Sequence, residues 1–577
     1  MRSCLIFMLM FTLLSAAEAQ QTPFEKDPKK NTTATYPQII RWYEQLDAAH
    51  EQMRLETSGT TDIGKPLHVI ILSRDKIFDP ETIRKQNKRV LFINNGIHPG
   101  EPEGIDASMM LTRDLLTKNA LPKDVVIVMI AVYNIDGCLN RGVSRINQNG
   151  PETYGFRGNY QNLDLNRDFI KADSRNSRSF QAIVSRWQPD IFWDNHTSNG
   201  ADYQYIMTLI ETQHNKLQAD LSAYMTKTFT PELYRRMKKS GYEMTPYVNP
   251  VGETPESGIA GFLDLPRYST GYMALHNVIG YMPETHMLKT FEQRVLSTCA
   301  IMNDLIRLTQ DESKNIAEVK KKADEAVSTQ ENFALNWDLD TTQVEKTHFL
   351  GYEAGHKKSE VSGLDRLFYD RKKPFEKDIP FFNTYKTTVS VKKPVAYIVP
   401  HSWEKVIERL KLNRVVMHPL KKDTLIDAEM YRITDLKNSA KPFEGHYLHS
   451  NVSVKKAVEK VQFFAGDLLI YTNQPVNRYI VETLEPQGAD SFFAWGFFDA
   501  ILGQKEHFSD YVFEDDAAAL LKKQPELRAM LEEAKKKDPE LAASAEAQLT
   551  FIYDHSPWKE PTFRRYPVGR ILHPVNL

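Results

Sequence analysis

Two side chains that could bind a metal ion lie close together in the segment His98-Pro-Gly-Glu101. The segment comes just after the apolar run 89–94, where Asn-Gly ends a predicted strand, so both side chains should lie on one short loop. Imidazole nitrogen and carboxylate oxygen are common ligands of catalytic zinc, which has three protein ligands and an open position for water. The pair therefore predicts a zinc hydrolase, provided that a third ligand comes from elsewhere in the chain.

His196 is the candidate third ligand. It follows a second short apolar run, residues 189–195, and begins the polar turn 196–200. In open α/β sheets, ligand-binding residues gather outside the carboxyl ends of the strands, so two neighbouring strands could bring His98, Glu101 and His196 together. A single His after a strand is more often a surface or capping residue, but His98 and Glu101 after the other strand make that interpretation less favoured. The sequence predicts one zinc ion per chain.

A loop rich in Arg and Asn lies between these ligands in the sequence. It follows the β-branched run 125–132, which is typical of a buried parallel strand and leads into Asn134-Ile-Asp-Gly137. It then passes Arg145 and reaches Asp164-Leu-Asn-Arg-Asp168. Arg presents a planar fork that can bind a carboxylate through two hydrogen bonds, and a nearby Asn adds a neutral donor. A single loop Arg is usually solvated, so only the set predicts anion recognition.

The order of these motifs resembles that of the zinc metallocarboxypeptidases of the carboxypeptidase A type, an M14-like family. H-x-x-E is followed by N-x-D-G, a loop Arg, D-L-N-R, a distant His and a later Glu, over roughly residues 60–310. The resemblance implies a mixed eight-stranded sheet with helices on both faces. It also implies an enzyme that removes residues from the free C-termini of peptides, in a bacterial-type member with a C-terminal extension.

The resemblance assigns roles to individual residues. It makes His98, Glu101 and His196 the zinc ligands, and it makes Asn166 with Arg167 the clamp on the terminal carboxylate of the substrate. A further Arg should polarise the scissile carbonyl. By order and spacing that residue is Arg145, and Arg141 and Arg157 stay open because the stretch between Gly137 and Asp164 does not align by eye.

The resemblance also requires a general base and a Tyr that covers the substrate. Glu284, in the strand-like run that ends at Glu284-Thr-His286, is the expected base. The family usually has this Glu in a longer aromatic and Leu-rich strand, followed by Arg, so the chain departs from the pattern here, and Glu284 or Thr285 as a helix cap is the other reading. Tyr272 is the expected covering residue, and Tyr268 is the alternative.

The implied mechanism is attack of a zinc-bound water, deprotonated by Glu284, on a peptide carbonyl held between the metal and Arg145. A carboxylate must take the proton from this water and later pass it to the leaving amine. Two alternatives stay open. A zinc deacylase or amidohydrolase of related fold would act on N-acyl amino acids or cell-wall peptides with the same metal ligands. A noncatalytic binding protein would have lost the base.

Length and composition set the domain count and the compartment. A chain of 577 residues needs at least two domains, and 73 Lys and Arg against 75 Asp and Glu give no electrostatic reason to expect nucleic acid. Residues 1–19 have a basic start, a short apolar core and an Ala-x-Ala end, which predicts a cleaved signal peptide and an exported enzyme, periplasmic or secreted. No later run is long and apolar enough to span a membrane. The oligomeric state stays open.

Beyond the signal peptide, we expect a catalytic domain over residues 20–330 and an accessory α+β region over 331–577. Strand-like runs near 387–391, 394–399 and 467–471 and two helical stretches near 515–534 and 538–552 support this division. Of the two cysteines left after cleavage, Cys138 and Cys299, one disulfide is possible, and two free thiols are favoured.

Overall fold

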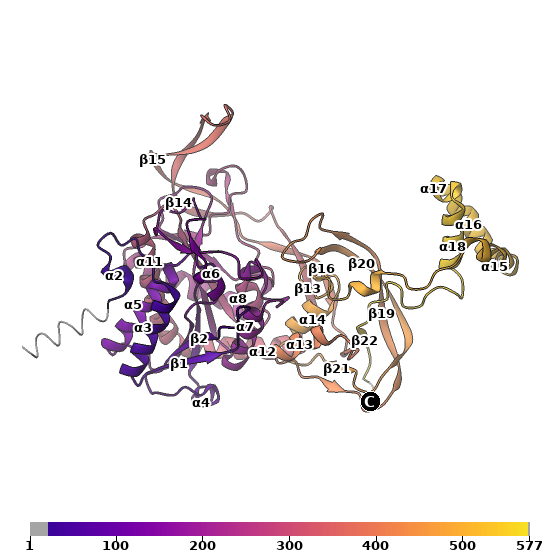
Figure 1. Cartoon of the computed structure of the whole chain (residues 1–577), viewed down its shortest axis with the longest axis horizontal. Coiled ribbons are helices and arrows are strands. Elements are labelled where there is room, and N and C mark those ends of the chain that lie inside the picture. The colour runs from indigo at the N-terminus through magenta and orange to yellow at the C-terminus, as the bar shows by residue number, and fades with distance from the viewer. Residues whose placement is uncertain (1–20, 575–577) are drawn as a thin grey trace, which may run out of the picture.

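The computed structural model describes residues 21–574, and the predicted signal peptide lies outside the described residues. Figure 1 shows three parts: an α/β region in indigo and magenta, a β-rich region beside it in orange, and a small group of helices set apart from both in yellow. Among the residues that the structure describes, no helix is long and apolar enough to cross a membrane.

A mixed sheet of nine strands forms the centre of the α/β region. Eight strands lie on one continuous path, which confirms the predicted eight-stranded mixed sheet, and the ninth, β8 (His196–Ser198), pairs with β12 and continues β7 after a break at Asn195. In order across the sheet, the path is β1 (Met53–Ser58), β2 (Leu67–Leu72), β4 (Val125–Ile130), β3 (Arg89–Asn94), β7 (Ile191–Asp194), β12 (Ile279–His286), β9 (Met207–Glu211) and β10 (Met244–Pro246).

The four central strands, β4, β3, β7 and β12, run parallel to one another. Every residue of these strands is buried, as expected for parallel strands covered on both faces, and the sequences of β4, β3 and β7 are accordingly mostly apolar, whereas β12 ends in polar residues. The flanking pairs β1–β2, β2–β4 and β12–β9 are antiparallel. Because β3, β7 and β12 point the same way, their carboxyl ends meet at one edge of the sheet.

Aromatic side chains show that both faces of the sheet are covered. On one face, Phe92 of β3 and Phe192 of β7 both pack against Phe180 of helix α7 (Arg175–Trp187). On the other face, Trp193 contacts Tyr281, which stacks on Phe229 of the π-helical turn η3 (Met225–Phe229). The alternation of Phe192 and Trp193 follows from the two-residue period of a strand.

The helices of this region include α2 (Pro23–Lys26), α3 (Tyr36–Ala49), α4 (Pro80–Lys85), α5 (Glu103–Thr117), α6 (Ile135–Leu139), α7 (Arg175–Trp187), α8 (Ala219–Tyr224), α9 (Thr230–Lys239), α10 (Ser269–Ala274), α11 (Phe291–Asp311) and α12 (Ser313–Thr329). Helix α11 starts at a capping box in which Thr290 and Gln293 satisfy each other's backbone N–H groups. It packs on α5, where the Oγ of Ser108 lies 3.8 Å from the Sδ of Met302.

The β-rich region contains two long hairpins and a six-stranded sheet, in agreement with the strands predicted beyond residue 330. One hairpin, β14 (Glu345–Lys358) with β15 (Asp365–Phe382), rises from the α/β region in Figure 1 and pairs at its base with β11 (Ile259–Ala260). β13 (Asn332–Leu339) pairs with β16 (Tyr385–Lys392). The sheet has the order β18 (His418–Pro419), β21 (Leu468–Tyr471), β17 (Ala396–Val399), β22 (Gly569–Ile571), β19 (Thr424–Asn438) and β20 (His449–Phe463).

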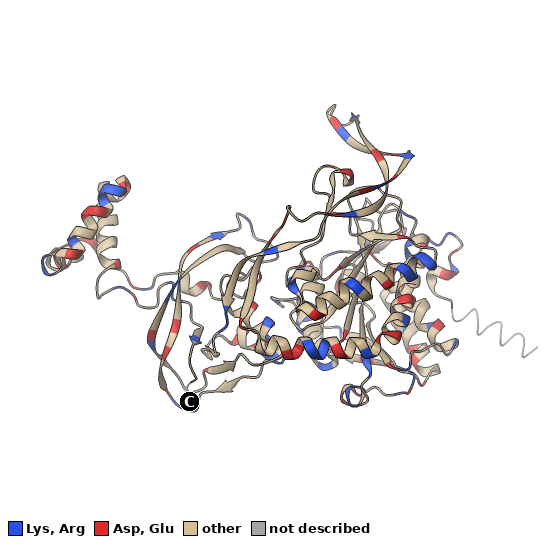
Figure 2. Cartoon of the chain, turned by 180° about the vertical axis from the view of Figure 1, so that it is seen from behind, with Lys and Arg blue, Asp and Glu red and all other residues tan. Residues whose placement is uncertain are grey.

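Helices α13 (Glu404–Leu412) and α14 (Asn477–Leu484) pack in the β-rich region, and the set-apart group consists of α15 (Asp510–Lys523), α16 (Pro525–Lys537), α17 (Pro539–Ala543) and α18 (Ala545–Asp554). That group has its own apolar core, which includes Phe513, Leu527 and Ile552. Figure 2 shows basic and acidic residues mixed along the helices. Both Cys138, which is buried, and Cys299, which is half-buried, are free thiols.

Candidate metal centre and active site

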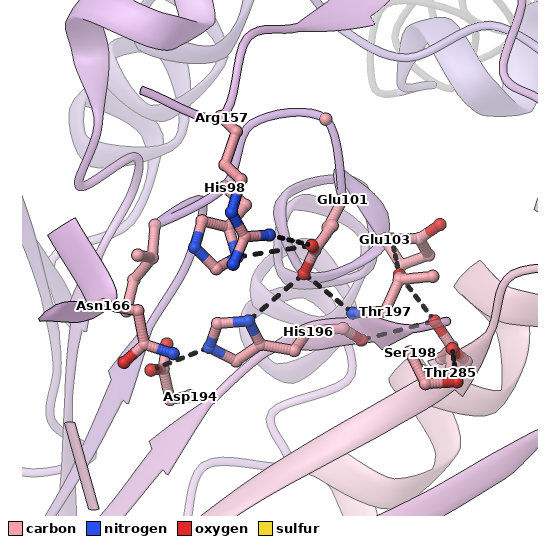
Figure 3. A network of polar contacts seen from close by, with 12 residues as sticks. His98, Glu101, Glu103, Arg157, Asn166, Asp194, His196, Thr197, Ser198 and Thr285 are labelled. Carbon is pink, nitrogen blue, oxygen red and sulfur yellow. Dashed lines mark hydrogen bonds and ion pairs between the residues drawn. The ribbon is translucent and has the colours of Figure 1, made fainter. Parts of the chain in front are cut away.

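The three predicted ligands meet at the carboxyl edge of the sheet. One ligand atom from each of His98, Glu101 and His196 lies within 4.8 Å of the others. All three side chains are buried, at 3%, 3% and 4% exposure. Figure 3 shows the two imidazole rings beside the carboxylate of Glu101. The structure therefore brings together the residues that the sequence places on two different strands.

The loop after β3 owes its shape to a tight turn. The N–H of Glu101 donates to the carbonyl of His98 at 2.8 Å, so both side chains leave the same turn, directly before α5. Gly104, in the first turn of α5, lies so close to the sheet that a Cβ at that position would be 2.4 Å from the Cβ of Asn195. Glycine therefore lets the helix approach the strand that carries His196.

The break between β7 and β8 positions His196. Asn195 turns its side chain inward, where it accepts from the indole of Trp193 at 2.9 Å and donates to Asn95 at 2.8 Å. Beyond the break, β8 pairs with β12, with Glu284 opposite His196 and Thr285 opposite Thr197. The predicted base and the third ligand therefore occupy neighbouring positions on adjacent strands.

Each imidazole is oriented by a second carboxylate. The Nε2 of His98 lies 2.8 Å from Asp164, and the Nε2 of His196 lies 3.0 Å from Asp194. Asp194 is itself held by the hydroxyl of Ser269 at 2.6 Å. Such carboxylate–histidine pairs fix the tautomer and leave the other ring nitrogen, here Nδ1, for a metal. Asp164 and Asp194 were not assigned a role from the sequence, although Asp194 stands two strand positions from His196 and so faces the same side.

The donor set fits zinc. The Nδ1 of His98 is buried and has no hydrogen-bond partner in the part of the chain that the structure describes, and it lies 3.3 Å from the carboxylate of Glu101. The Nδ1 of His196 lies 3.1 Å from Glu101. Burial lowers the pKa of His196, but Asp194 and Glu101 more than offset this and hold it well above its ordinary value. The cluster thus favours a positive charge between its carboxylates, and two nitrogens with one carboxylate are a typical donor set for catalytic zinc.

The carboxylate of Glu101 is surrounded by hydrogen-bond donors and positive charges. It accepts the N–H of Thr197 at 2.9 Å, is paired with Arg145, and lies 3.3 Å from Arg157. Burial opposes its charge, but Arg145 and the imidazoles hold the pKa of Glu101 well below its ordinary value. The group is therefore ionised and ready to act as a ligand.

Glu284 has a different environment, although it lies in the same cluster of charges. It is 8% exposed, and no described residue donates a hydrogen bond to its carboxylate. Burial, with a smaller repulsion from Glu101, raises its pKa to about 8, against the attraction of His196, Arg145 and Arg157. Two carboxylates with pKa values displaced in opposite directions are the arrangement in which one binds and the other transfers protons.

Two of the three candidate arginines reach the cluster. Arg145 contacts Glu101 and donates to the carbonyl of Thr197 at 2.7 Å. Arg157 also contacts Glu101, and it is bound to Asp164 through Nε and Nη2 at 2.9 Å each. Arg141 points elsewhere and donates to the backbone of the segments 33–34 and 153. Because its guanidinium lies away from the cluster, Arg141 is not a candidate for the residue that polarises the scissile carbonyl.

The predicted clamp residues have free donors. The carbonyl oxygen of the Asn166 amide accepts the N–H of Ser269 at 3.2 Å, which leaves Nδ2 without a partner among the described residues. The guanidinium of Arg167 lies 4.5 Å from the ring centre of Tyr268, and it pairs only loosely with Asp164, at 3.9 Å. Its Nη1 donates to the backbone carbonyl of Asn166 at 2.9 Å, and its other nitrogens remain available to a ligand. Both residues belong to the short helix η1 (Leu165–Arg167), which Asp164 caps.

The prediction that Tyr272 covers the substrate is wrong. Its side chain is 1% exposed, and its hydroxyl donates to Asn413 at 2.6 Å. Because α10 turns its ring toward Phe169 and His276, Tyr272 lies in the core. The alternative, Tyr268, instead supports Arg167.

Tyr247 was missed from the sequence. It follows β10, its N–H donates to Leu209 at 3.0 Å, and its ring contacts Phe262. Burial raises the pKa of Tyr247, and Glu284 and Glu101 add to the effect, which puts its hydroxyl within electrostatic reach of the cluster. The sequence before it, Glu243-Met-Thr-Pro246, contains no pattern that would select this Tyr.

Comparison with known proteins finds zinc carboxypeptidases and their relatives. The family model described as zinc carboxypeptidase matches residues 39–245. Carboxypeptidase 2 of Trichophyton equinum is 22% identical over 452 residues, covering 75% of this chain and 77% of that protein. Carboxypeptidase 2 of Trichophyton rubrum is also 22% identical, over 70% of this chain and 73% of that protein.

Solved structures give fainter matches. A metallo-carboxypeptidase from Pseudomonas aeruginosa is 13% identical, with a TM-score of 0.37, over 49% of this chain and 70% of that chain. The carboxypeptidase A of Helicoverpa armigera is 14% identical, with a TM-score of 0.38, over 53% of this chain and 81% of that chain.

Proposed function

We propose that the chain is an exported member of the zinc carboxypeptidase family, whose model matches residues 39–245, and that it removes single residues from the free C-termini of peptides. The observation that carries the proposal is the register of β8 and β12, which sets Glu284 opposite His196 at the edge where the other two ligands lie. Export rests on the sequence of residues 1–19 alone.

His98, Glu101 and His196 would hold the zinc ion. When bound, zinc would act as a Lewis acid toward the scissile carbonyl and lower the pKa of a water molecule. The carboxylate of Glu284 would take a proton from the attacking water and pass it to the leaving amine as the C–N bond breaks. Its raised pKa suits both steps, because a group that titrates near neutral pH can accept and then donate a proton.

Arg145 is the residue that we assign to the carbonyl oxygen of the substrate. Arg157 is held by Asp164 through two nitrogens, whereas Arg145 contacts only Glu101 and one backbone carbonyl through its guanidinium. Arg145 therefore has more freedom to turn toward a developing oxyanion, and a guanidinium so placed stabilises it electrostatically.

Asn166 and Arg167 would bind the terminal carboxylate of the peptide. The free Nδ2 of Asn166 and the guanidinium of Arg167, which lies over the ring of Tyr268, offer a neutral donor and a charged fork. This clamp would restrict cleavage to the last peptide bond. The products are a free amino acid and a peptide shorter by one residue.

The test is mass spectrometry of the mature protein, loaded with zinc, on pairs of peptides that differ only in a free or amidated C-terminus. We expect single residues to be lost stepwise from the free acids, and the loss to stop with a chelator and return with zinc. Arg167→Ala should raise KM for the free acids, and Arg175→Ala, at an exposed Arg outside the clamp, is the matched control.

An N-acyl amino acid belongs in the same assay. Its hydrolysis without release from peptides would replace the proposal with a deacylase. Internal cleavage of either peptide would contradict the role of the clamp. Zinc binding without any cleavage would indicate a binding protein that has kept the fold.

A further inference from the structure

A turn of the β-rich region reaches the substrate clamp of the α/β region. It connects β19 and β20, and at its end the side chain of Glu444 accepts the backbone N–H of Asp164 at 2.8 Å. The same turn carries His446, whose Nε2 lies 2.6 Å from Asp173. Two hydrogen bonds thus join this turn to the segment 164–173, which contains Asn166 and Arg167.

Asp164 is the residue through which this contact acts. One of its carboxylate oxygens binds the Nε2 of His98 at 2.8 Å and also caps η1 through the N–H of Asn166 at 2.9 Å. Its backbone N–H is the group that Glu444 holds. A single residue therefore connects Glu444 to a predicted zinc ligand and to the start of the clamp.

The β-rich region also holds the other side of the clamp. Asp490 accepts the backbone N–H of Arg267 at 2.8 Å and pairs with its guanidinium at 2.7 Å. That guanidinium lies over the rings of Phe443 and Trp495. The next residue is Tyr268, on which Arg167 rests. Arg167 thus lies between two segments that are both fastened to the β-rich region.

The backbone conformation of Glu444 indicates that its side chain does more than shape the turn. Its φ is +50°, a left-handed conformation that glycine or asparagine adopts at lower cost than a Glu. Gly445 follows with φ +84°. The local geometry thus disfavours a long side chain at 444, and the contact with Asp164 is what such a side chain provides.

We propose that Glu444 is a positioning residue of the active site, which fixes the Asp164–Arg167 segment and thereby completes the binding site for the substrate carboxylate. The inference rests on the proposed carboxypeptidase function. It makes the β-rich region a part of the catalytic unit. A catalytic domain confined to residues 20–330 would lack this support.

The experiment compares Glu444→Ala, Glu444→Asp and Glu444→Gln in the full mature chain, with Lys441→Ala as the control at an exposed position of the same turn. Gln keeps an oxygen that can accept the Asp164 N–H, whereas Asp keeps the charge but is one methylene too short. We measure KM and kcat on a peptide with a free C-terminus, and separately the rate at which a chromogenic chelator removes zinc.

We expect Ala and Asp to raise KM about tenfold, the size of a lost hydrogen bond to a charged group, with kcat changed less than about threefold. Both should release zinc several-fold faster, because Asp164 orients His98. Gln should match the wild type in both measurements. The expected pattern is one that general destabilisation does not produce, since it separates KM from kcat and Gln from Asp.

The inference is overturned if Ala and Asp behave like Lys441→Ala in both assays, or if Gln is impaired as much as Ala. Failure of the proposed function would look different, because the wild type would then cleave no peptide. Zinc release would still decide the role of Glu444 in that case: equal rates in all four variants would reject it.

Discussion

The parallel core of the α/β sheet and the hairpin β14–β15 differ in what they expose. Every residue of β3 and β4 is buried, whereas the hairpin β14–β15 buries side chains only near its base, as with Phe349 and Ile379. The parallel strands end together and deliver His98, Glu101 and Glu284 to one edge. The hairpin strands of the β-rich region end in turns that project, and one of these turns reaches the same edge through Glu444.

This difference in burial determines which part of each β-structure can hold functional side chains. A covered parallel sheet can hold charged groups at its edge because its strands cannot shift without exposing an apolar core. The outer part of the hairpin β14–β15 packs on no such core, so its side chains lack this constraint. We therefore expect substitutions at the parallel edge to abolish chemistry or folding, and substitutions along the outer part of the hairpin β14–β15 to be mild.

The largest effect should come from Glu284→Gln. The amide cannot take a proton from water, so kcat should fall by roughly 10³–10⁴ while the protein still binds one zinc per chain. Steady-state kinetics and elemental analysis of the same sample measure the two quantities. Substantial residual activity with full zinc occupancy would mean that another group is the base and that the edge is not organised as described.

Core packing provides a direct contrast between the two regions. Ile93 of β3 is fully buried, so Ile93→Ala should lower the free energy of unfolding by about 2–5 kcal/mol. Val361, at the tip of the β14–β15 hairpin, is 99% exposed, and Val361→Ala should change the free energy of unfolding by less than about 0.5 kcal/mol. Denaturant unfolding of both variants checks the pair, and similar losses would remove the distinction between the regions.

Asp194→Asn tests the support of the metal ligands. The amide can still accept from His196 but no longer carries the charge that favours a cation, so zinc affinity should drop about 10- to 100-fold. Competition with a chelator measures the affinity. Asp365→Asn, at an exposed carboxylate on the hairpin, is the control and should leave it unchanged. Equal affinities in both variants would reject a role for Asp194 in metal binding.

The smallest effect concerns the pH dependence of stability. Burial raises the pKa of Asp106 in α5 to about 7, although the hydroxyl of Thr33 donates to it and lowers the value somewhat. In the unfolded chain this carboxyl loses its proton near pH 4, so its contribution to stability is present below that pH and is lost as the pH rises through about 7.

Between pH 5 and pH 8 the wild type should therefore lose about 2 kcal/mol of stability that Asp106→Asn does not lose. Denaturant unfolding of both proteins across this range measures the difference. Parallel curves would show that Asp106 is ionised in the folded state.

The sequence allowed prediction of the central sheet and of the metal ligands because both depend on local pattern. Continuous apolar runs identify the parallel strands, and His98 with Glu101 form one turn. The eight-stranded mixed sheet and the three-residue cluster are confirmed. The roles of Asn166, Arg167 and Glu284 stay predictions until variants are measured.

The remaining features depend on contacts between distant segments. The place of Tyr272 before Glu284 predicts a residue that covers the substrate, but packing against Phe169 and Asn413 sets the orientation of α10 and buries this side chain. Tyr247 comes near Glu284 only because β10 pairs with β9. The contact of Glu444 with Asp164 spans two regions of the chain, and no local periodicity encodes it.

The position of β22 within its sheet has a consequence for biosynthesis. β22 is an interior strand, between β17 and β19, yet it comes after every other strand in the sequence. During translation, the edges of β17 and β19 that pair with β22 stay unpaired until the helices α15–α18 and then β22 have been synthesised. Open edges of this kind can pair with other chains, so the nascent protein needs protection during this interval. If Glu444 completes the active site, the enzyme also gains its activity only after that strand has been added.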